Sequence, residues 1–224
     1  MLFFKSRLIS ALIVFALIPA TAAAGELYTD FPQQIRVGEK YVFYSHGFIV
    51  EGTNPRPVNQ RWGTYEFPAV KRALADPGYN LIAYHRPAKT DPVLFAEKMA
   101  GDIRTLLSQG VNAEDIYLVG FSRGGAISIL TSNVLKQEKV NLVILAGCSK
   151  YMKKNPQYRI YGKVYSIYET SDGVGSCQFV IDRSPGAQAF EEIAISTGKK
   201  HGAFYTPIKE WVNPVKDWIK LTIE

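Results

Sequence analysis

Short apolar runs alternate with amphipathic segments along most of the chain. Apolar runs rich in β-branched and aromatic residues are typical of buried strands, and apolar residues at every third or fourth position are typical of helices. The runs predict core strands at residues 40–45, 80–84, 116–119, 141–146, 163–168 and 191–197, with a short edge strand near 34–37. Helical patterns cover 65–75, the stretch from Asp91-Pro92 to Gly110, the stretch from Arg123 to Val134, and a closing helix capped by Asn213-Pro214.

Strands that alternate with helices in this way predict one fold class. Right-handed crossovers place the carboxyl ends of parallel strands at one edge of the sheet and put helices on both faces. We therefore expect a three-layer α/β/α sandwich whose mostly parallel sheet has about six strands. Ligands bind outside the carboxyl ends of such strands, so the chemistry of this chain should lie there.

The segment from residue 116 to 127 carries the most specific motif. A buried strand runs into Gly120-Phe121-Ser122-Arg123-Gly124, and a helical pattern follows at once. A Gly-x-Ser-x-Gly at a strand-to-helix turn is typical of a nucleophile elbow, in which a strained serine stands clear of the sheet. The glycines leave room for nearby backbone, and the helix N-terminus faces the negative charge that develops in the reaction. A phosphate-binding loop does not fit, because the Gly-Lys-Ser/Thr ending is missing.

The first 24 residues have the features of a secretory signal peptide. Lys5 and Arg7 precede an apolar run at 8–18, and Ala22-Ala23-Ala24 offers a cleavage site. An N-terminal membrane anchor is the alternative, but the run is shorter than the roughly 20 apolar residues that span a bilayer. Cleavage after Ala24 would leave a single domain, residues 25–224, that is periplasmic or secreted and has no stable membrane span.

Charge and cysteine content narrow the partners and the compartment. Lys and Arg number 26 against 20 Asp and Glu, so removal of Lys5 and Arg7 leaves 24 minus 20, a net charge of +4. This mild excess favours an anionic substrate or surface, but without an aromatic-basic ladder or zinc-ligand spacing it does not indicate nucleic-acid binding. Cys148 and Cys177 each follow one of two successive strands, so we expect a disulfide beside the site, with two free thiols as the alternative.

A serine nucleophile needs a base, and the base needs an orienting carboxylate. The chain has only three histidines. His201 lies just past the last predicted strand and is the expected base, the alternative being a solvated loop histidine. Asp172 lies just past the preceding strand and is the expected carboxylate, with Glu169 and Asp182 as competitors.

Further candidates follow the other strands. The backbone N–H groups of Phe48 and Arg123 are the expected oxyanion donors. The expected substrate-pocket residues are His46, Trp62, Arg86 and Tyr205. His46 is more often structural than catalytic at such a place, and His85 is expected to pack. Arg86 or Arg123 could hold an acidic substrate group, and a structural salt bridge is the alternative for both.

From about Lys40 to Trp218 the chain resembles the α/β-hydrolase superfamily, on the strength of the Gly120 to Gly124 motif, the His46-Gly47-Phe48 turn, Asp172 and His201. The resemblance implies a serine hydrolase without metal or cofactor that acts on an ester or related acyl substrate. Ser122 would attack, His201 would carry the proton, and Asp172 would orient His201. The first two strands of the fuller family pattern are missing or reduced. The segment from Gly147 to Lys163 is too short for a large lid, so the loop 51–63 should supply part of the pocket wall.

These residues predict an exported carboxylic-ester hydrolase with a small-molecule acyl substrate. An acyltransferase or thioesterase with the same triad is a second reading, because water and other acceptors use one acyl-enzyme. A non-catalytic binding protein on the same fold is a third.

Overall fold

The computed structural model describes residues 25–221, and the predicted signal peptide lies outside them. The strands are β1 (Leu27–Tyr28), β2 (Tyr41–Ser45), β3 (Val58–Asn59), β4 (Gly63–Thr64), β5 (Asn80–Ile82), β6 (Ile116–Phe121), β7 (Asn141–Leu145), β8 (Tyr161–Glu169) and β9 (Gly186–Ile195). The helices are α1 (Phe67–Leu74), α2 (Pro92–Ser108), α3 (Arg123–Leu135), α4 (Gln178–Ile181) and α5 (Lys209–Leu221), with short 3-10 turns η1 (Phe48–Val50), η2 (Ala113–Asp115), η3 (Lys150–Lys154) and η4 (Lys200–Phe204).

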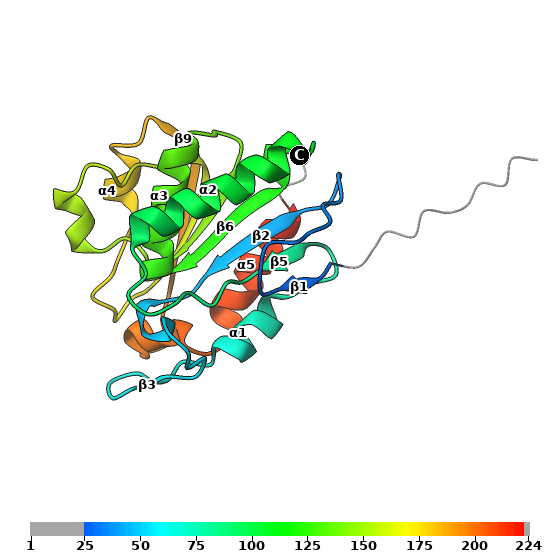
Figure 1. Cartoon of the computed structure of the whole chain (residues 1–224). Helices are drawn as coiled ribbons and strands as arrows, with labels where there is room; N and C mark the ends of the chain where they lie inside the picture. The colour runs from blue at the N-terminus through cyan, green and yellow to red at the C-terminus, as the bar shows by residue number, and fades with distance from the viewer. Residues whose placement is uncertain (1–24, 222–224) are drawn as a thin grey trace, which may run out of the picture.

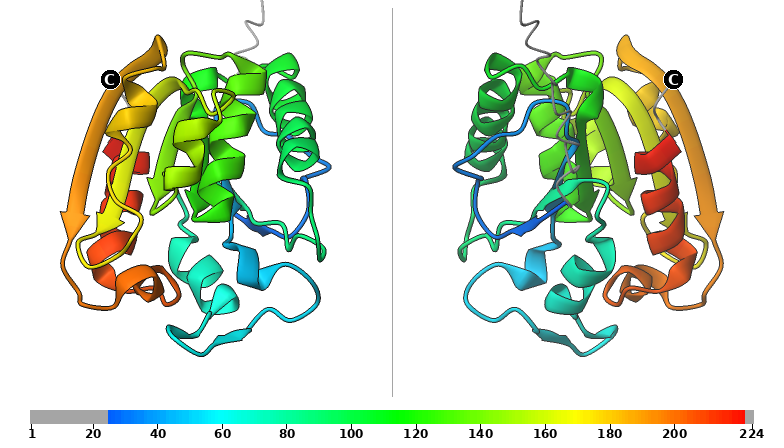
Figure 2. Two further views of the ribbon diagram at one scale, coloured as in Figure 1. Left: turned by 90° about the vertical axis from the view of Figure 1, so that its left-hand side faces the viewer. Right: turned by 90° about the vertical axis from the view of Figure 1, so that its right-hand side faces the viewer.

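The main sheet has seven strands in the order β1-β5-β2-β6-β7-β8-β9, and every neighbouring pair is parallel. The chain passes from β2 outward to β5 and then returns to place β6 on the other side of β2. The strand order therefore reverses at β2, and the crevice outside β2 and β6 is where ligands bind in sheets of this kind. The small antiparallel β3–β4 hairpin hangs below this edge of the sheet (Figure 2).

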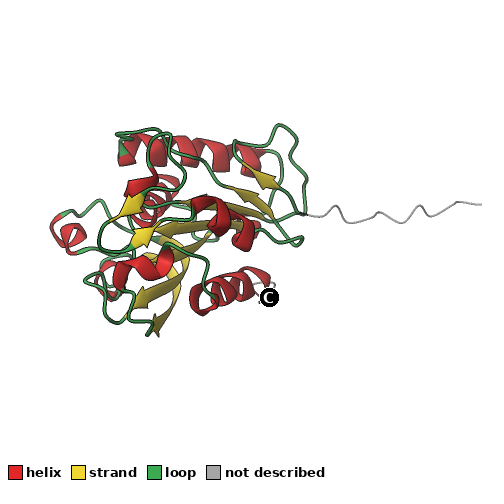
Figure 3. Ribbon diagram, turned by 90° about the horizontal axis from the view of Figure 1, so that it is seen from below, coloured by secondary structure: helices red, strands yellow, loops and turns green. Residues whose placement is uncertain are grey.

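Helices cover both faces of the sheet, as the alternation of strands and helices predicts. Tyr41 and Phe43 of β2 pack with α2 and α3, whereas Val42 and Tyr44 pack with α1 and α5. The two sets alternate because successive strand residues point to opposite faces. Figures 1 and 3 show the resulting three layers, with the strands between the two groups of helices. The predicted sandwich is confirmed.

Two predicted details are wrong. No strand forms at 34–37, and the edge strand is instead Leu27–Tyr28, which pairs with β5. The closing helix does not begin at Asn213-Pro214, because α5 already starts at Lys209 and holds Pro214 inside it. Trp211 and Val212 are buried, so the apolar face of α5 begins before the proline.

Helix α3 is buried more completely than its predicted stripe requires. Every residue from Ile127 to Ser132 is buried, because α2 packs over the face of α3 that turns away from the sheet. The Thr131 hydroxyl donates a hydrogen bond to the Ile127 carbonyl of the same helix at 2.9 Å. The helix that follows Ser122 is thus held firmly on both sides. Among residues 25–221, no helix is long and apolar enough to cross a membrane.

Candidate active site

Ser122 occupies the strained turn that its motif predicts. It joins β6 to α3 with φ 54° and ψ −115°, a conformation that non-glycine residues rarely adopt. A Cβ atom at Gly120 would overlap the Gly124 carbonyl, and one at Gly124 would overlap the Ser45 carbonyl of β2. Only glycine therefore fits at either position. The turn lifts Ser122 out of the sheet at the carboxyl end of the central strand.

The structure brings Ser122, His201 and Asp172 together from three separate loops. His201 Nε2 lies 2.8 Å from Ser122 Oγ, and His201 Nδ1 lies 2.6 Å from Asp172 Oδ2. Since a carboxylate can only accept, Nδ1 carries the proton and the Nε2 lone pair faces the serine hydroxyl. His201 is 8% exposed and rests against the rings of Trp62 and Phe121, at 5.1 and 4.8 Å between ring centroids. It is therefore not a solvated loop histidine.

The two competing carboxylates are occupied elsewhere. Glu169 is the last residue of β8 and accepts hydrogen bonds from the backbone N–H groups of Ser171, Thr197 and Gly198 at 2.7 to 2.9 Å. Burial opposes its ionisation, but these bonds and that of the Ser171 hydroxyl prevail and lower the pKa of Glu169 to about 2. Asp182 follows α4 and accepts a hydrogen bond from the Gln178 side chain. Neither forms a hydrogen bond or ion pair with His201 in the described structure.

A cavity of about 630 Å³ opens beside Ser122 and His201, within the usual size range of small-molecule sites. Its walls are mostly apolar and aromatic, and they are formed by Gly47, Phe48, Ile49, Glu51, Asn59, Trp62, Ala88, Lys89, Phe121, Ser122, His201 and Tyr205. Trp62 and Tyr205 thus lie where the sequence places them. The loop that follows η1 contributes to the wall, as predicted, through Glu51, Asn59 and Trp62.

Solved structures of distant sequence share this architecture. SOBER1 of Arabidopsis thaliana is 14% identical, with a TM-score of 0.57 over 84% of this chain and 100% of that one. An arylesterase is 11% identical, with a TM-score of 0.56 over 85% of this chain and 78% of that one. A Pectobacterium atrosepticum protein described as a YdeN-like hydrolase is 12% identical, with a TM-score of 0.53 over 83% and 94% of the two chains. The chain has the α/β-hydrolase fold.

No protein-family model and no curated protein matches the chain. Relative to the fuller α/β-hydrolase pattern, the N-terminal part of the sheet is reduced to β1, which has only two residues. The site lies at the place where open α/β sheets bind their ligands, outside β2 and β6.

Phe48 and Arg123, whose N–H groups are the predicted oxyanion donors, each begin a helical turn. Phe48 is the first residue of η1 and Arg123 is the first residue of α3. The first N–H groups of a helix have no partner within it. Within residues 25–221, no other group accepts a hydrogen bond from either N–H. Both N–H groups are therefore without a hydrogen-bond partner in the described part of the chain.

His46 and Arg86 do not line the cavity, which corrects the prediction for both. Each is at most 1% exposed. His46 donates from Nδ1 to the Gly47 carbonyl and accepts at Nε2 from the Arg86 N–H, so both ring nitrogens are used. Burial and the nearby Arg86 charge lower the pKa of His46 well below its usual value, which keeps the ring neutral. His85 also packs, with Nε2 donating to the Val50 carbonyl.

Glu51 lines the cavity beside Ser122, and the sequence does not reveal it as a residue of the site. Its buried carboxylate lies 3.4 Å from Arg86 Nε and 2.9 Å from Arg123 Nε. Burial lowers the pKa of Arg86 to about 10, and Glu51 opposes that change. The guanidinium of Arg86 also donates to the His46 carbonyl at 2.5 Å. This network fastens the turn that carries Phe48 to the start of α3. In the sequence, only Arg86 and Arg123 pointed to it, as residues that could form a structural salt bridge.

The predicted disulfide between Cys148 and Cys177 is present. Their Cα atoms are 5.1 Å apart, and the bond joins the loop after β7 to the start of α4. The described residues contain no cluster of three His, Cys, Asp or Glu side chains that could hold a metal ion.

Proposed function

We propose that the protein is a serine hydrolase that cleaves a carboxylic ester or a related acyl bond. The observation that carries the proposal is the unbroken pair of hydrogen bonds from Asp172 through His201 to Ser122. Ser122 is the nucleophile, His201 is the base, and Asp172 holds the imidazole in the tautomer that can accept the serine proton. The N–H groups of Phe48 and Arg123 stabilise the oxyanion.

The reaction proceeds in two balanced halves. Ser122 Oγ attacks the carbonyl carbon as its proton passes to His201 Nε2, and the imidazolium then gives that proton to the departing alcohol as the ester C–O bond breaks. Water then attacks the acyl-enzyme, loses a proton to His201 and releases the acid, and Ser122 recovers its proton. Asp172 stabilises the imidazolium in both halves without becoming protonated.

The cavity and the neighbours support an acyl substrate. A mostly apolar cavity of about 630 Å³ beside Ser122 can take an acyl or aryl group but gives little polar recognition. Structures of similar fold include an arylesterase and a YdeN-like hydrolase. We also propose that the protein acts outside the cytoplasm, since the disulfide persists best in an oxidising compartment.

The test is turnover of p-nitrophenyl esters from acetate to decanoate by the protein lacking residues 1–24. We expect release of nitrophenolate that Ser122→Ala reduces to background and that Ser108→Ala, at an exposed serine at the end of α2, leaves unchanged. Turnover that survives in Ser122→Ala would overturn the proposal. Added alcohol distinguishes the acceptors: an acyltransferase would give mainly the new ester, whereas a hydrolase gives mainly the acid.

A further inference from the structure

A second cavity meets the first at Ser122. It has a volume of about 360 Å³ and lies between the start of α3, the loop after β7, and η3. Of the residues that the structure describes, Ser122 alone lines both cavities. Unlike the first cavity, the second has no acidic residue in its wall, and its polar side chains besides Ser122 are Arg123, Ser149, Tyr151 and Tyr158. Each of these can donate a hydrogen bond.

The Arg123 guanidinium is only partly neutralised. Its Nε donates to Glu51 at 2.9 Å and its Nη2 donates to the Thr90 carbonyl at 2.6 Å. No residue within 25–221 accepts a hydrogen bond from its remaining Nη1, and the side chain is 31% exposed. Glu51 is shared with Arg86, so two guanidinium groups face one carboxylate and one positive charge is left over.

The Tyr158 hydroxyl is a second unused donor in the same cavity. Tyr158 is 6% exposed, and no described residue accepts or donates a hydrogen bond at its hydroxyl. Tyr158 and Arg123 line the same cavity. Burial and the neighbouring Tyr151 raise the pKa of Tyr158 and the Arg123 charge opposes that rise, so the phenol stays protonated at neutral pH. The Tyr158 hydroxyl borders the cavity rather than being sealed in the core, so a ligand oxygen can replace water as its partner there.

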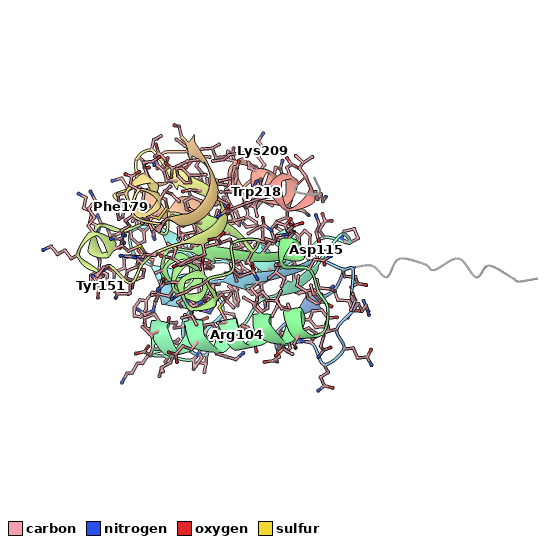
Figure 4. The ribbon with its side chains drawn as sticks, turned by 90° about the horizontal axis from the view of Figure 1, so that it is seen from above. Arg104, Asp115, Tyr151, Phe179, Lys209 and Trp218 are labelled. Atoms are coloured by element: carbon pink, nitrogen blue, oxygen red, sulfur yellow. A yellow bond between two sulfur atoms is a disulfide. The ribbon has the colours of Figure 1, made fainter. Side chains whose placement is uncertain are left out.

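The surroundings add positive charge. The residues from Cys148 to Ile160 include Lys150, Lys153, Lys154 and Arg159 and no Asp or Glu. Tyr151 stands on this segment at one end of the molecule, whereas Asp115, which precedes β6, lies toward the other end (Figure 4). The disulfide from Cys148 to Cys177 ties the segment to α4, so the cavity is held in shape before a ligand arrives.

We infer that the second cavity binds a carboxylate carried by the substrate, an inference that rests on the proposed hydrolase function. The substrate is then an ester with an apolar group on one side of the scissile bond and a carboxylate on the other. Arg123 Nη1 and the Tyr158 hydroxyl converge on the carboxylate, because charge-assisted hydrogen bonds from arginine suit its geometry. The aromatic-walled cavity takes the apolar group.

Two matched ester pairs test this inference. In the first pair the carboxylate lies on the alcohol side of the scissile bond, and in the second pair it lies on the acyl side. The pairs are 4-acetoxybenzoate against its methyl ester, and mono-4-nitrophenyl adipate against 4-nitrophenyl hexanoate. After correction for alkaline hydrolysis rates, we expect kcat/KM for the anionic member of one pair to exceed that of its neutral partner roughly 10- to 100-fold. The preference should shrink as salt rises from about 0.02 to about 0.5 M.

Variants test whether the second cavity causes the preference for the anionic ester. Tyr158→Phe should lower kcat/KM for the anionic ester about tenfold and leave the neutral ester within about twofold, whereas Tyr168→Phe on β8 should change neither. Arg123→Gln should bring the anionic-to-neutral ratio close to 1, whatever its effect on overall rate. A preference that survives in both Tyr158→Phe and Arg123→Gln overturns the assignment to this cavity. Equal rates within both pairs, with turnover that depends on Ser122, overturn the inference alone, and no Ser122-dependent turnover of any of the four esters overturns the proposed function with it.

Discussion

The Glu169 carboxylate accepts a hydrogen bond from the backbone N–H of Gly198 at 2.9 Å, which fastens the end of β8 to the turn that leads into His201. The same carboxylate accepts from the N–H groups of Thr197 and Ser171. Asp172 lies three residues further along and takes the His201 bond instead. Two carboxylates three residues apart thus have different roles: Glu169 holds the end of β8 to the turn before His201, and Asp172 faces the imidazole.

This division predicts opposite phenotypes for two conservative variants. Asp172→Asn should lower kcat for a p-nitrophenyl ester about 10³- to 10⁴-fold with little change in stability, because an amide favours the wrong imidazole tautomer. Glu169→Gln should lower the free energy of unfolding by about 1–3 kcal/mol and cost far less in kcat, because it weakens charge-assisted hydrogen bonds to the loops. Steady-state kinetics and urea unfolding of both variants measure this. A larger loss of kcat in Glu169→Gln than in Asp172→Asn would contradict this assignment of roles.

The low pKa of Glu169 predicts a specific acid sensitivity. Its pKa is about 2 in the folded chain against an ordinary value of 4.5, so the unfolded chain takes up the proton first as pH falls. The stability that Glu169 contributes is therefore complete above about pH 4.5 and is lost as pH falls toward about 2. Glu169→Gln should be less stable than wild type at pH 7, and the gap should narrow below pH 4.5. A gap that is constant with pH in urea titrations would contradict this.

The close approach behind Ser122 predicts that Gly124 cannot be replaced. Gly124→Ala would drive a methyl group into the Ser45 carbonyl, so we expect a loss of about 3 kcal/mol or more and loss of esterase turnover. Gly101→Ala is the matched control, because that position lies inside α2 with open space around it. It should stabilise the protein by about 0.5–1 kcal/mol. Thermal melts of the two variants would contradict the packing argument if both behaved alike.

The disulfide should contribute measurably to stability. It closes a loop with a sequence separation of 29 residues, for which chain entropy predicts about 3–4 kcal/mol. The double variant Cys148→Ser, Cys177→Ser should melt about 10 °C lower than wild type, and reduced wild type should match it. Mass analysis without reduction gives the independent check, since two free thiols in protein purified without reductant would rule the bond out.

Much of this molecule could be predicted from local patterns. The core strands can be predicted from apolar runs. The turn at Ser122 can be predicted from its motif, whose glycines are required because neighbouring backbone leaves no room for a Cβ atom. His201 could be predicted as the base because the chain has only three histidines and one of them follows the last strand. These features depend on residues that are close in sequence or on strand ends that the topology brings to one edge.

The remaining features depend on long-range packing that leaves no local pattern. His46 and Arg86 follow strands, as pocket residues should, yet the turn from Phe48 to Glu51 folds over them. In the sequence, Glu51 is one of several loop carboxylates. Only the structure shows that Arg86 and Arg123 both pair with it. β1 has only two residues and is a strand solely because β5 lies beside it.

Labelling by a fluorophosphonate tests the central claim most directly, because the reagent requires a serine activated by its neighbours. Intact mass of the wild-type protein should show one adduct, peptide mapping should place it on Ser122, and Ser122→Ala should remain unlabelled. His201→Ala should label slowly at best. An adduct on another residue, or equal labelling of wild type and Ser122→Ala, would contradict the proposal that Asp172 and His201 activate Ser122.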